Sequence, residues 1–277
     1  MSFKYAELGK DEFRLLEPLQ GTDPTKSRFN VIHRRREPGI PYTAVSYTWG
    51  DEKATEVIEL DGKEAYIRPN LWSCLYCLNN LTTPRTWQYV SADAIYINQT
   101  DILERNFQVT TMAEVYRRAL VVNVWLGLEP QDVTLSPSMG VTDGIDSKRG
   151  FQWEDAIPDL INRPYWTRIW VIQEFLLAMR LEILCGRNQI SLLDFEHLIR
   201  KYLSNIGDGN LLMAPLVQAC APAPMILERR LHSFSLESLH KLVELISRQQ
   251  HSSCKDPRDR VFALLNLVFE EERDILT

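Results

Sequence analysis

Hydrophobic positions alternate between strand-like runs and helical stripes along the first two thirds of the chain. Runs of β-branched and aromatic residues at about 43–49, 87–92, 120–126 and 181–185 predict four buried strands. The run at 120–126 is almost continuously apolar, which is typical of a central strand in a parallel sheet. Apolar residues recur at helical spacing between these runs. The alternation predicts βαβ units, with one mainly parallel sheet and helices on both of its faces.

Local signals predict a hairpin and a helix in the first third. Residues 57–67 are expected to form a β-hairpin, because Asp61-Gly62 tolerates the positive φ angles of its turn. Asn70 is expected to cap a helix whose apolar side carries Leu71, Cys74, Leu75, Leu78 and Leu81.

Further signals organise the rest of the chain. Asp101, with Glu104 three residues later, resembles the capping box of another helix. Residues 129–150 are rich in Pro, Gly, Ser and Asp, which predicts a long surface loop. Helices are expected at 164–179 and after Ser191, Ser235 and Asp256. We therefore expect a core domain at 1–190, with N-terminal strands and a hairpin, and a helical extension packed on it at 191–277.

Composition and charge exclude several classes of protein. The chain has 277 residues and a net charge of −6, so no basic face for nucleic acid is expected. The N-terminus carries no apolar signal segment, and the prolines at 215, 222 and 224 interrupt the uncharged stretch 209–227. No membrane span is therefore expected. Five cysteines are an odd number, which indicates reduced thiols and a cytoplasmic location.

Motifs of metal sites and common catalytic sites are missing from the sequence. Cys74 and Cys77 form a lone CxxC, and the five histidines stand singly, so no metal site is expected. Phosphate-binding glycine loops and hydrolase nucleophile elbows are absent as well. We expect no prosthetic group.

Two carboxylates stand out as candidate functional groups. Glu174 lies on the predicted helix 164–179, which is apolar nearly all round, so it must be hydrogen-bonded, paired or protonated there. It is either a catalytic group or the structural partner of an arginine such as Arg168 or Arg258. Asp93 follows a predicted strand and is either a ligand-binding group or a cap. Trp49 and Gly50 end another strand, where Trp49 would stack on a planar ligand or pack in the core.

Five segments, in order along the chain, resemble the motif blocks of the fungal heterokaryon incompatibility (HET) domain. They are YTAVSYTWGD at 42–51, DAIYINQ and ERNFQV within 93–109, the segment 112–127, RPYWTRIWVIQE at 163–174, and DPRDRVFALLNL at 256–267. Three positions differ from the usual pattern: Ser91 replaces a tryptophan, Tyr96 a cysteine and Asn266 a glycine.

HET domains are similar to Toll/interleukin-receptor (TIR) domains, and this resemblance implies a fold and an activity. The implied fold is a flavodoxin-like three-layer α/β fold with a mainly parallel sheet. The implied activity is hydrolysis of NAD, with NAD as a substrate and not as a bound cofactor, and Glu174 as the catalytic carboxylate. The implied nucleotide pocket consists of Trp49, Gly50, Asp51, Asp93, Arg168 and Trp170.

The resemblance also implies regulated cell death, homo-oligomerisation on activation, and an upstream incompatibility or NLR-type receptor as partner. The alternative is a non-enzymatic signalling module that acts by self-assembly and partner recruitment. A third interpretation, a metabolic nucleotide-binding enzyme, has no phosphate loop to support it.

Overall fold

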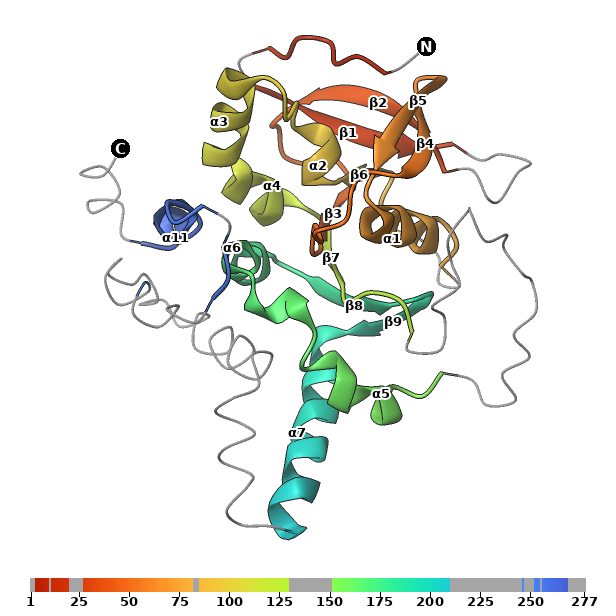
Figure 1. Cartoon of the computed structure of the whole chain (residues 1–277), viewed down its shortest axis with the longest axis vertical. Helices are drawn as coiled ribbons and strands as arrows, with labels where there is room; N and C mark the ends of the chain where they lie inside the picture. The colour runs from red at the N-terminus through yellow and green to blue at the C-terminus, as the bar shows by residue number, and fades with distance from the viewer. Residues whose placement is uncertain are drawn as a thin grey trace. The chain divides into compact units, whose positions relative to one another are not determined.

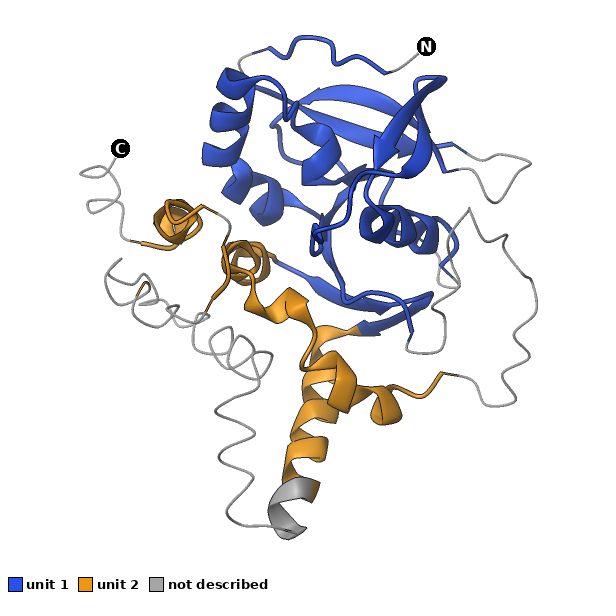
Figure 2. Cartoon of the chain, in the orientation of Figure 1, with its two compact units in different colours: residues 1–150, 179–190 blue, residues 151–178, 191–277 orange. Residues whose placement is uncertain are grey.

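The computed structural model describes residues 3–9, 11–19, 27–81, 85–129, 151–209, 246, 252–254 and 256–268 (Figure 1). The expected loop at 129–150, apart from its first residue, lies outside the described residues, as do the stretch after Gly209 and the helix expected after Ser235. The chain is an α/β protein that divides into two compact units (Figure 2). Unit 1 combines residues 1–150 with 179–190, and unit 2 combines residues 151–178 with 191–277.

The described part of unit 1 is built on a nine-stranded sheet with the order β5-β4-β2-β1-β6-β3-β7-β8-β9. The strands are β1 (Glu12–Pro18), β2 (Arg28–Arg35), β3 (Tyr42–Ser46), β4 (Glu56–Leu60), β5 (Lys63–Ile67), β6 (Tyr89–Ser91), β7 (Val121–Trp125), β8 (Leu181–Cys185) and β9 (Asn188–Ser191). All four strands expected from the hydrophobic runs are present among them.

The sheet is mixed rather than mainly parallel. Its centre, β6-β3-β7-β8, is parallel throughout, and a further parallel pairing joins β2 to β4. By contrast, β1 runs antiparallel to both β2 and β6, and β4 runs antiparallel to β5. Only residues 19–27 connect β1 to β2, which is too short for the crossover that a parallel pair requires. The short connection therefore explains the antiparallel pairing of β1 with β2.

The apolar run at 120–126 forms β7, which is a central strand as expected. It lies between β3 and β8, and all five of its residues are buried. Its polar residue, Asn123, donates from its side-chain amide to Thr43 Oγ1 at 2.6 Å, and that hydroxyl donates to the Val121 carbonyl at 3.0 Å. These bonds replace part of the water contacts that the side chains lose on burial, since Asn123 Oδ1 has no hydrogen-bond partner among the described residues.

Helices cover both faces of the parallel centre (Figure 1). α1 (Pro69–Asn79) packs on the face that carries Val45 of β3. Tyr42, three residues earlier in β3, points to the opposite face, where its hydroxyl donates to a backbone carbonyl of α4 (Met112–Arg118) at 2.6 Å. The three-layer arrangement expected from the sequence is therefore present around β3.

Two of the three local signals in unit 1 behave as expected. The β4–β5 hairpin turns at Asp61 and Gly62, whose φ angles are +50° and +73°. Asp101 caps α3 (Ile102–Thr110) by accepting the backbone N–H of Glu104 at 3.0 Å. Only this half of the expected capping box forms, because the Glu104 carboxylate binds Arg14 and the Asn98 N–H instead. The cap assigned to Asn70 is wrong: α1 already begins at Pro69, whose fixed φ suits the first helical position.

Unit 2 is helical in its described part. Its elements are α5 (Trp153–Leu160), the 3₁₀ turn η2 (Pro164–Thr167), α6 (Ile169–Leu177), α7 (Leu192–Gly209), the short α11 (Asp259–Phe262) and η3 (Leu265–Leu267). The single helix expected at 164–179 is interrupted, because Arg168 is extended (φ −74°, ψ 136°) and forms a bridge with Ser253. Tyr165 and Trp166 therefore do not share the α6 helical face.

Buried aromatic contacts explain why residues 151–178 belong to unit 2 and not to the core domain expected at 1–190. The ring of Phe195 in α7 stacks on Trp166, with centroids 6.2 Å apart, and meets the edge of Trp153 at 6.2 Å. Unit 1 ends at residue 190, and unit 2 continues from residue 191. Among the described residues, no helix combines the length and the apolar character needed to span a membrane.

Candidate functional site

The carboxyl ends of β3 and β6 bring two predicted site residues together. Trp49 follows β3, and Asp93 begins the short helix α2 (Asp93–Tyr96) directly after β6. Since β3 and β6 are parallel neighbours, these ends meet at one edge of the sheet. The indole N–H of Trp49 donates to Asp93 Oδ2 at 2.7 Å, and the Ala94 N–H donates to Oδ1 at 2.7 Å. Asp93 is only 7% exposed, so these donors compensate part of its lost hydration.

Gly50 and Asp51 form the turn that leaves this edge. Gly50 has a φ of +71°, a conformation that glycine adopts without strain. A Cβ at this position would meet no atom within 4 Å, so the space beside the Gly50 backbone is open. Asp51 is exposed. The turn therefore borders the Trp49–Asp93 pair with an accessible stretch of backbone.

Arg68, which the sequence analysis did not single out, lies beside the same turn. Its guanidinium carbon is 5.3 Å from the centroid of the Trp49 ring, and its Nη1 donates to the Gly50 carbonyl at 3.1 Å. Guanidinium groups prefer the electron-rich face of an indole. Trp49 thus has a cation over its ring and a carboxyl group at its N–H.

Asn70 joins the end of β3 to the end of β7. Its side-chain amide donates to the Thr48 carbonyl at 2.5 Å, and its Oδ1 accepts the indole N–H of Trp125 at 2.8 Å. This is why Asn70 does not cap α1: both of its polar atoms are used at the edge of the sheet. The asparagine fixes the path of the chain immediately before Trp49.

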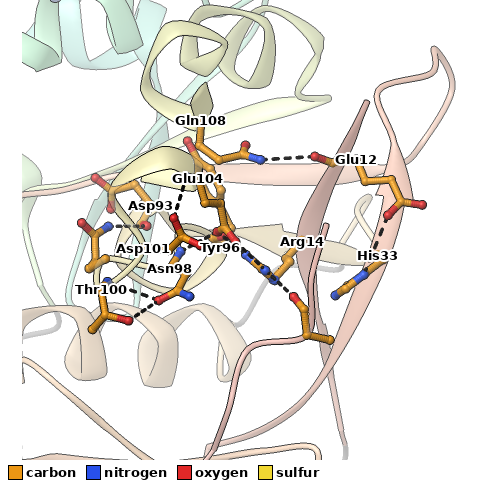
Figure 3. Close-up of polar contacts among 12 residues, drawn as sticks. Glu12, Arg14, His33, Asp93, Tyr96, Asn98, Thr100, Asp101, Glu104 and Gln108 are labelled. Carbon is orange, nitrogen blue, oxygen red and sulfur yellow. Dashed lines mark hydrogen bonds and ion pairs between the residues drawn. The ribbon is translucent and has the colours of Figure 1, made fainter. Parts of the chain in front are cut away.

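An ion pair between the buried Arg14 and the partly buried Glu104 supports the segment that follows Asp93 (Figure 3). Arg14 of β1 donates to both carboxylate oxygens of Glu104, at 2.6 and 2.9 Å, and to the Tyr96 carbonyl at 2.9 Å. Glu104 also accepts the backbone N–H of Asn98 at 2.8 Å. Burial acts to raise the pKa of Glu104, but these hydrogen bonds and the Arg14 charge outweigh it and hold the pKa below its usual range. The network fixes the connection from α2 to α3.

The other predicted site residues belong to unit 2. Glu174 lies in α6 and is 1% exposed. Trp170, one turn earlier, donates a hydrogen bond to Asp259, whose pKa is raised by burial in spite of this bond and the nearby charge of Arg168. Gln173 accepts from the Asn266 side chain at 3.3 Å. The segment 256–268 and α6 therefore share polar contacts as well as an apolar core, which contains Ile169, Ile172, Leu264, Leu265 and Val268.

The predicted site residues thus fall into two groups. Trp49, Gly50, Asp51 and Asp93 lie together in unit 1, whereas Arg168, Trp170 and Glu174 lie in unit 2. The proximity expected between Glu174 and the Trp49–Asp93 pair involves both units and stays a prediction.

The cysteine pair does not form part of this site. Cys74 and Cys77 are both fully buried in α1, and burial raises the pKa of the Cys74 thiol well above its ordinary value. Core packing is therefore the role that the structure gives them. Across the described residues, no group of three or more His, Cys, Asp or Glu side chains is arranged to hold a metal ion.

Comparison with known proteins identifies the central part of the chain. The family model of the heterokaryon incompatibility protein (HET) matches residues 42–174, from the start of β3 to Glu174. The chain carries a HET domain. It is also 33% identical over 142 residues to heterokaryon incompatibility protein 6, OR allele, of Neurospora crassa, a match that covers 48% of this chain.

The chain spans about a fifth of that curated relative, since the match covers 20% of its length. No solved structure matches the chain, so the expected similarity of this HET domain to TIR domains stays a prediction. The HET match includes Trp49, Asp93 and Arg68 in unit 1, and Trp170 and Glu174 in unit 2.

Two residues of the HET domain were missed as site residues by the sequence analysis. Arg68 precedes a helix and contacts Trp49, which is nineteen positions earlier, so no local pattern indicates the pairing. Asn70 has the sequence context of a cap, which hid its contacts with Thr48 and Trp125. Ser91, at the usual tryptophan position, is buried in β6, and its hydroxyl has no hydrogen-bond partner among the described residues. This serine therefore leaves a polar group where the family usually has an indole.

Proposed function

We propose that this HET domain acts in fungal heterokaryon incompatibility and regulated cell death by hydrolysing NAD at the nicotinamide–ribose bond. The observation that carries the proposal is the pairing of Trp49 with the buried Asp93 at the carboxyl edge of a parallel sheet centre. Ligands of open α/β sheets bind at this edge. The name of the Neurospora relative supports the biological role, and the motif resemblance supports the substrate.

The reaction requires stabilisation of a positive charge on the ribose. When the bond breaks, nicotinamide leaves with the bonding electron pair, and the ribose carbon becomes oxocarbenium-like. Water then adds to this carbon and releases a proton, giving nicotinamide and ADP-ribose. Glu174 is proposed as the carboxylate that stabilises the cation, because a negative charge placed near an oxocarbenium ion lowers the barrier. A glutamate at 1% exposure in an apolar helix is expected to be hydrogen-bonded, paired or protonated, and burial raises the tendency of a carboxyl group to act as an acid or base.

The residues of unit 1 are proposed to bind the nucleotide. Asp93 accepts hydrogen bonds from ribose hydroxyls, as buried carboxylates do in nucleotide-binding α/β proteins. Trp49 offers a partly exposed indole for stacking. Gly50 and Asp51 border the ligand. The nucleotide-binding role expected of Arg168 and Trp170, which belong to unit 2, stays a prediction.

The test is release of nicotinamide from NAD by the purified chain, compared between wild type and Glu174→Gln. Gln keeps the size of the side chain and removes its charge. We expect a loss of at least about a hundredfold in kcat with unchanged thermal unfolding. Glu196→Gln is the control, because Glu196 is also a buried glutamate on a helix of unit 2. Full activity in a folded Glu174→Gln protein would rule out Glu174 as the catalytic carboxylate, and no release of nicotinamide by wild type would rule out the enzymatic function.

A non-enzymatic assembly module is the second candidate, and an exposed apolar surface favours it. Ile102, Leu103 and Phe107 of α3 are 62%, 83% and 41% exposed, while Glu104 and Gln108 of the same helix make the contacts with β1. Large apolar side chains exposed together are typical of association surfaces.

The variant Leu103→Glu tests the assembly function. The assembly module predicts that this change abolishes concentration-dependent association in sedimentation velocity. The control is Leu193→Glu, since Leu193 is 76% exposed on α7 of unit 2. Association that is unaffected by Leu103→Glu would rule out this surface as the basis of assembly.

A further inference from the structure

Arg68 is a cation whose partners in the described part of the chain are an indole ring and a backbone carbonyl. Among the described residues it makes no ion pair, and its hydrogen bond goes to a neutral acceptor, the Gly50 carbonyl. Other arginines of unit 1, such as Arg14, Arg28 and Arg180, pair with glutamates at 2.6 or 2.7 Å. A guanidinium carries five N–H donors in a planar fork that matches phosphate oxygens. One hydrogen bond therefore leaves most of the binding capacity of Arg68 unused.

The surroundings of Arg68 indicate the kind of ligand it would bind. The guanidinium lies over the ring of Trp49, 5.3 Å from its centroid, while the N–H of the same indole donates to Asp93. The space beside Gly50, whose carbonyl accepts from Arg68, is open. A cation and a carboxyl group thus lie around one indole. This pair suits a ligand that has both an anionic group and neutral hydroxyl donors.

We propose that Arg68 binds the phosphate of a nucleotide whose ribose hydroxyls bind Asp93. The choice of a nucleotide rests on the function proposed above, whereas the phosphate contact follows from the geometry of Arg68. Inorganic phosphate and pyrophosphate have no ribose hydroxyls for Asp93, and a nucleoside has no anion for Arg68. Binding therefore requires both parts of the ligand. The phosphate-bearing nucleotide is the ligand class that satisfies both residues.

Unit 1 contains a matched control for this assignment. The guanidinium of Arg85 lies 5.2 Å from the centroid of the Trp87 ring and, like Arg68, donates to a backbone carbonyl, that of Asn79, at 3.0 Å. Trp87 precedes β6, so this pair lies at the amino end of the strand whose carboxyl end carries Asp93. Arg85→Gln therefore removes an arginine–indole pair away from the proposed site.

The experiment measures the affinity of the full chain for ADP-ribose, adenosine and inorganic pyrophosphate by calorimetry. Wild type is expected to bind ADP-ribose at least about tenfold more tightly than either fragment. Arg68→Gln should weaken ADP-ribose binding by at least about tenfold, because it removes charge-assisted hydrogen bonds to phosphate. It should leave adenosine binding unchanged, and Arg85→Gln should change neither. Equal ADP-ribose affinity in wild type and Arg68→Gln, or no ADP-ribose binding by wild type, would overturn the assignment.

A second variant covers the case in which Arg68→Gln does not fold. Arg68→Lys keeps the charge but loses the planar fork, so ADP-ribose binding should weaken while adenosine binding is unchanged. Unaltered ADP-ribose binding in this variant would overturn the assignment.

Failure of the proposed function can be recognised separately. If NAD is not cleaved but ADP-ribose binding still depends on Arg68, hydrolysis is refuted and the phosphate contact stands. If NAD is cleaved and Arg68→Gln leaves KM unchanged, hydrolysis stands and the phosphate contact is refuted.

Discussion

Replacing Glu104 by glutamine should destabilise unit 1 by about 3 kcal/mol. The change leaves the guanidinium of Arg14, whose side chain is 1% exposed, without its carboxylate partner. Removing one member of a buried ion pair costs on the order of 3–5 kcal/mol, because the remaining charge stays out of water. The expected value is at the lower end, since glutamine can still accept one hydrogen bond and the Tyr96 and Ala6 carbonyls still bind Arg14.

Thermal unfolding and hydrogen exchange provide the measurement. For a chain of this size, about 3 kcal/mol corresponds to a decrease of roughly 6–12 °C in Tm. The backbone amide of Asn98 should exchange faster, because its N–H donates to the Glu104 carboxylate in wild type. Glu114→Gln is the control: the Glu114–Arg118 pair is 3.5 Å apart and both side chains are at least 40% exposed, so a loss below about 1 kcal/mol is expected. A Tm of Glu104→Gln within 2 °C of wild type would refute the reasoning.

The same pair should make stability depend on pH in the acid range. The pKa of Glu104 is lower in the folded protein than in the unfolded chain. The contribution of Glu104 to the free energy of unfolding is therefore complete above its pKa in the unfolded chain, which is about 4.3. This contribution is lost as the pH falls through the pKa of Glu104 in the folded protein. The difference in Tm between wild type and Glu104→Gln should shrink as the pH falls below about 4, and a constant difference would contradict the assignment of the charge effect to this pair.

Other predictions concern the edge of the sheet, the core of unit 2 and assembly. Asn70→Ala should cost about 2–3 kcal/mol in urea unfolding, because the Trp125 indole N–H and the Thr48 carbonyl both lose their partner; a cost below 0.5 kcal/mol would contradict this. Gly50→Ala should cost about 1–2 kcal/mol from its positive φ alone, and Gly50→Asn less, so equal losses would contradict the conformational explanation. Leu264→Ala should cost about 2–5 kcal/mol, since the side chain is fully buried, and a neutral result would contradict its place in the core. If hydrolysis occurs, specific activity should rise with protein concentration, and a flat profile down to monomeric samples would argue against control by assembly.

Periodicity and turn chemistry determined much of the fold. The apolar run of β7 predicts its central place, because a strand covered on both faces has no polar side. Asp61-Gly62 predicts the hairpin, and Asp101 the cap of α3, because backbone angles and hydrogen bonds within four residues decide both. The motifs at 42–174 also indicated the HET domain, which the family match over those residues confirms. These features depend on neighbours in the chain, so the sequence alone contains them.

Features that depend on residues far apart in the sequence were decided only by the tertiary structure. The antiparallel flank of the sheet, the contact of Arg68 with Trp49 and the pairing of Arg14 with Glu104 join segments separated by up to 90 positions. The extended Arg168, which interrupts the expected helix, forms a bridge with Ser253. In each case a distant partner compensates a buried charge, an unpaired backbone group or an exposed ring face. Local propensity cannot specify such a partner, because the energy gained depends on which side chains the fold places next to it.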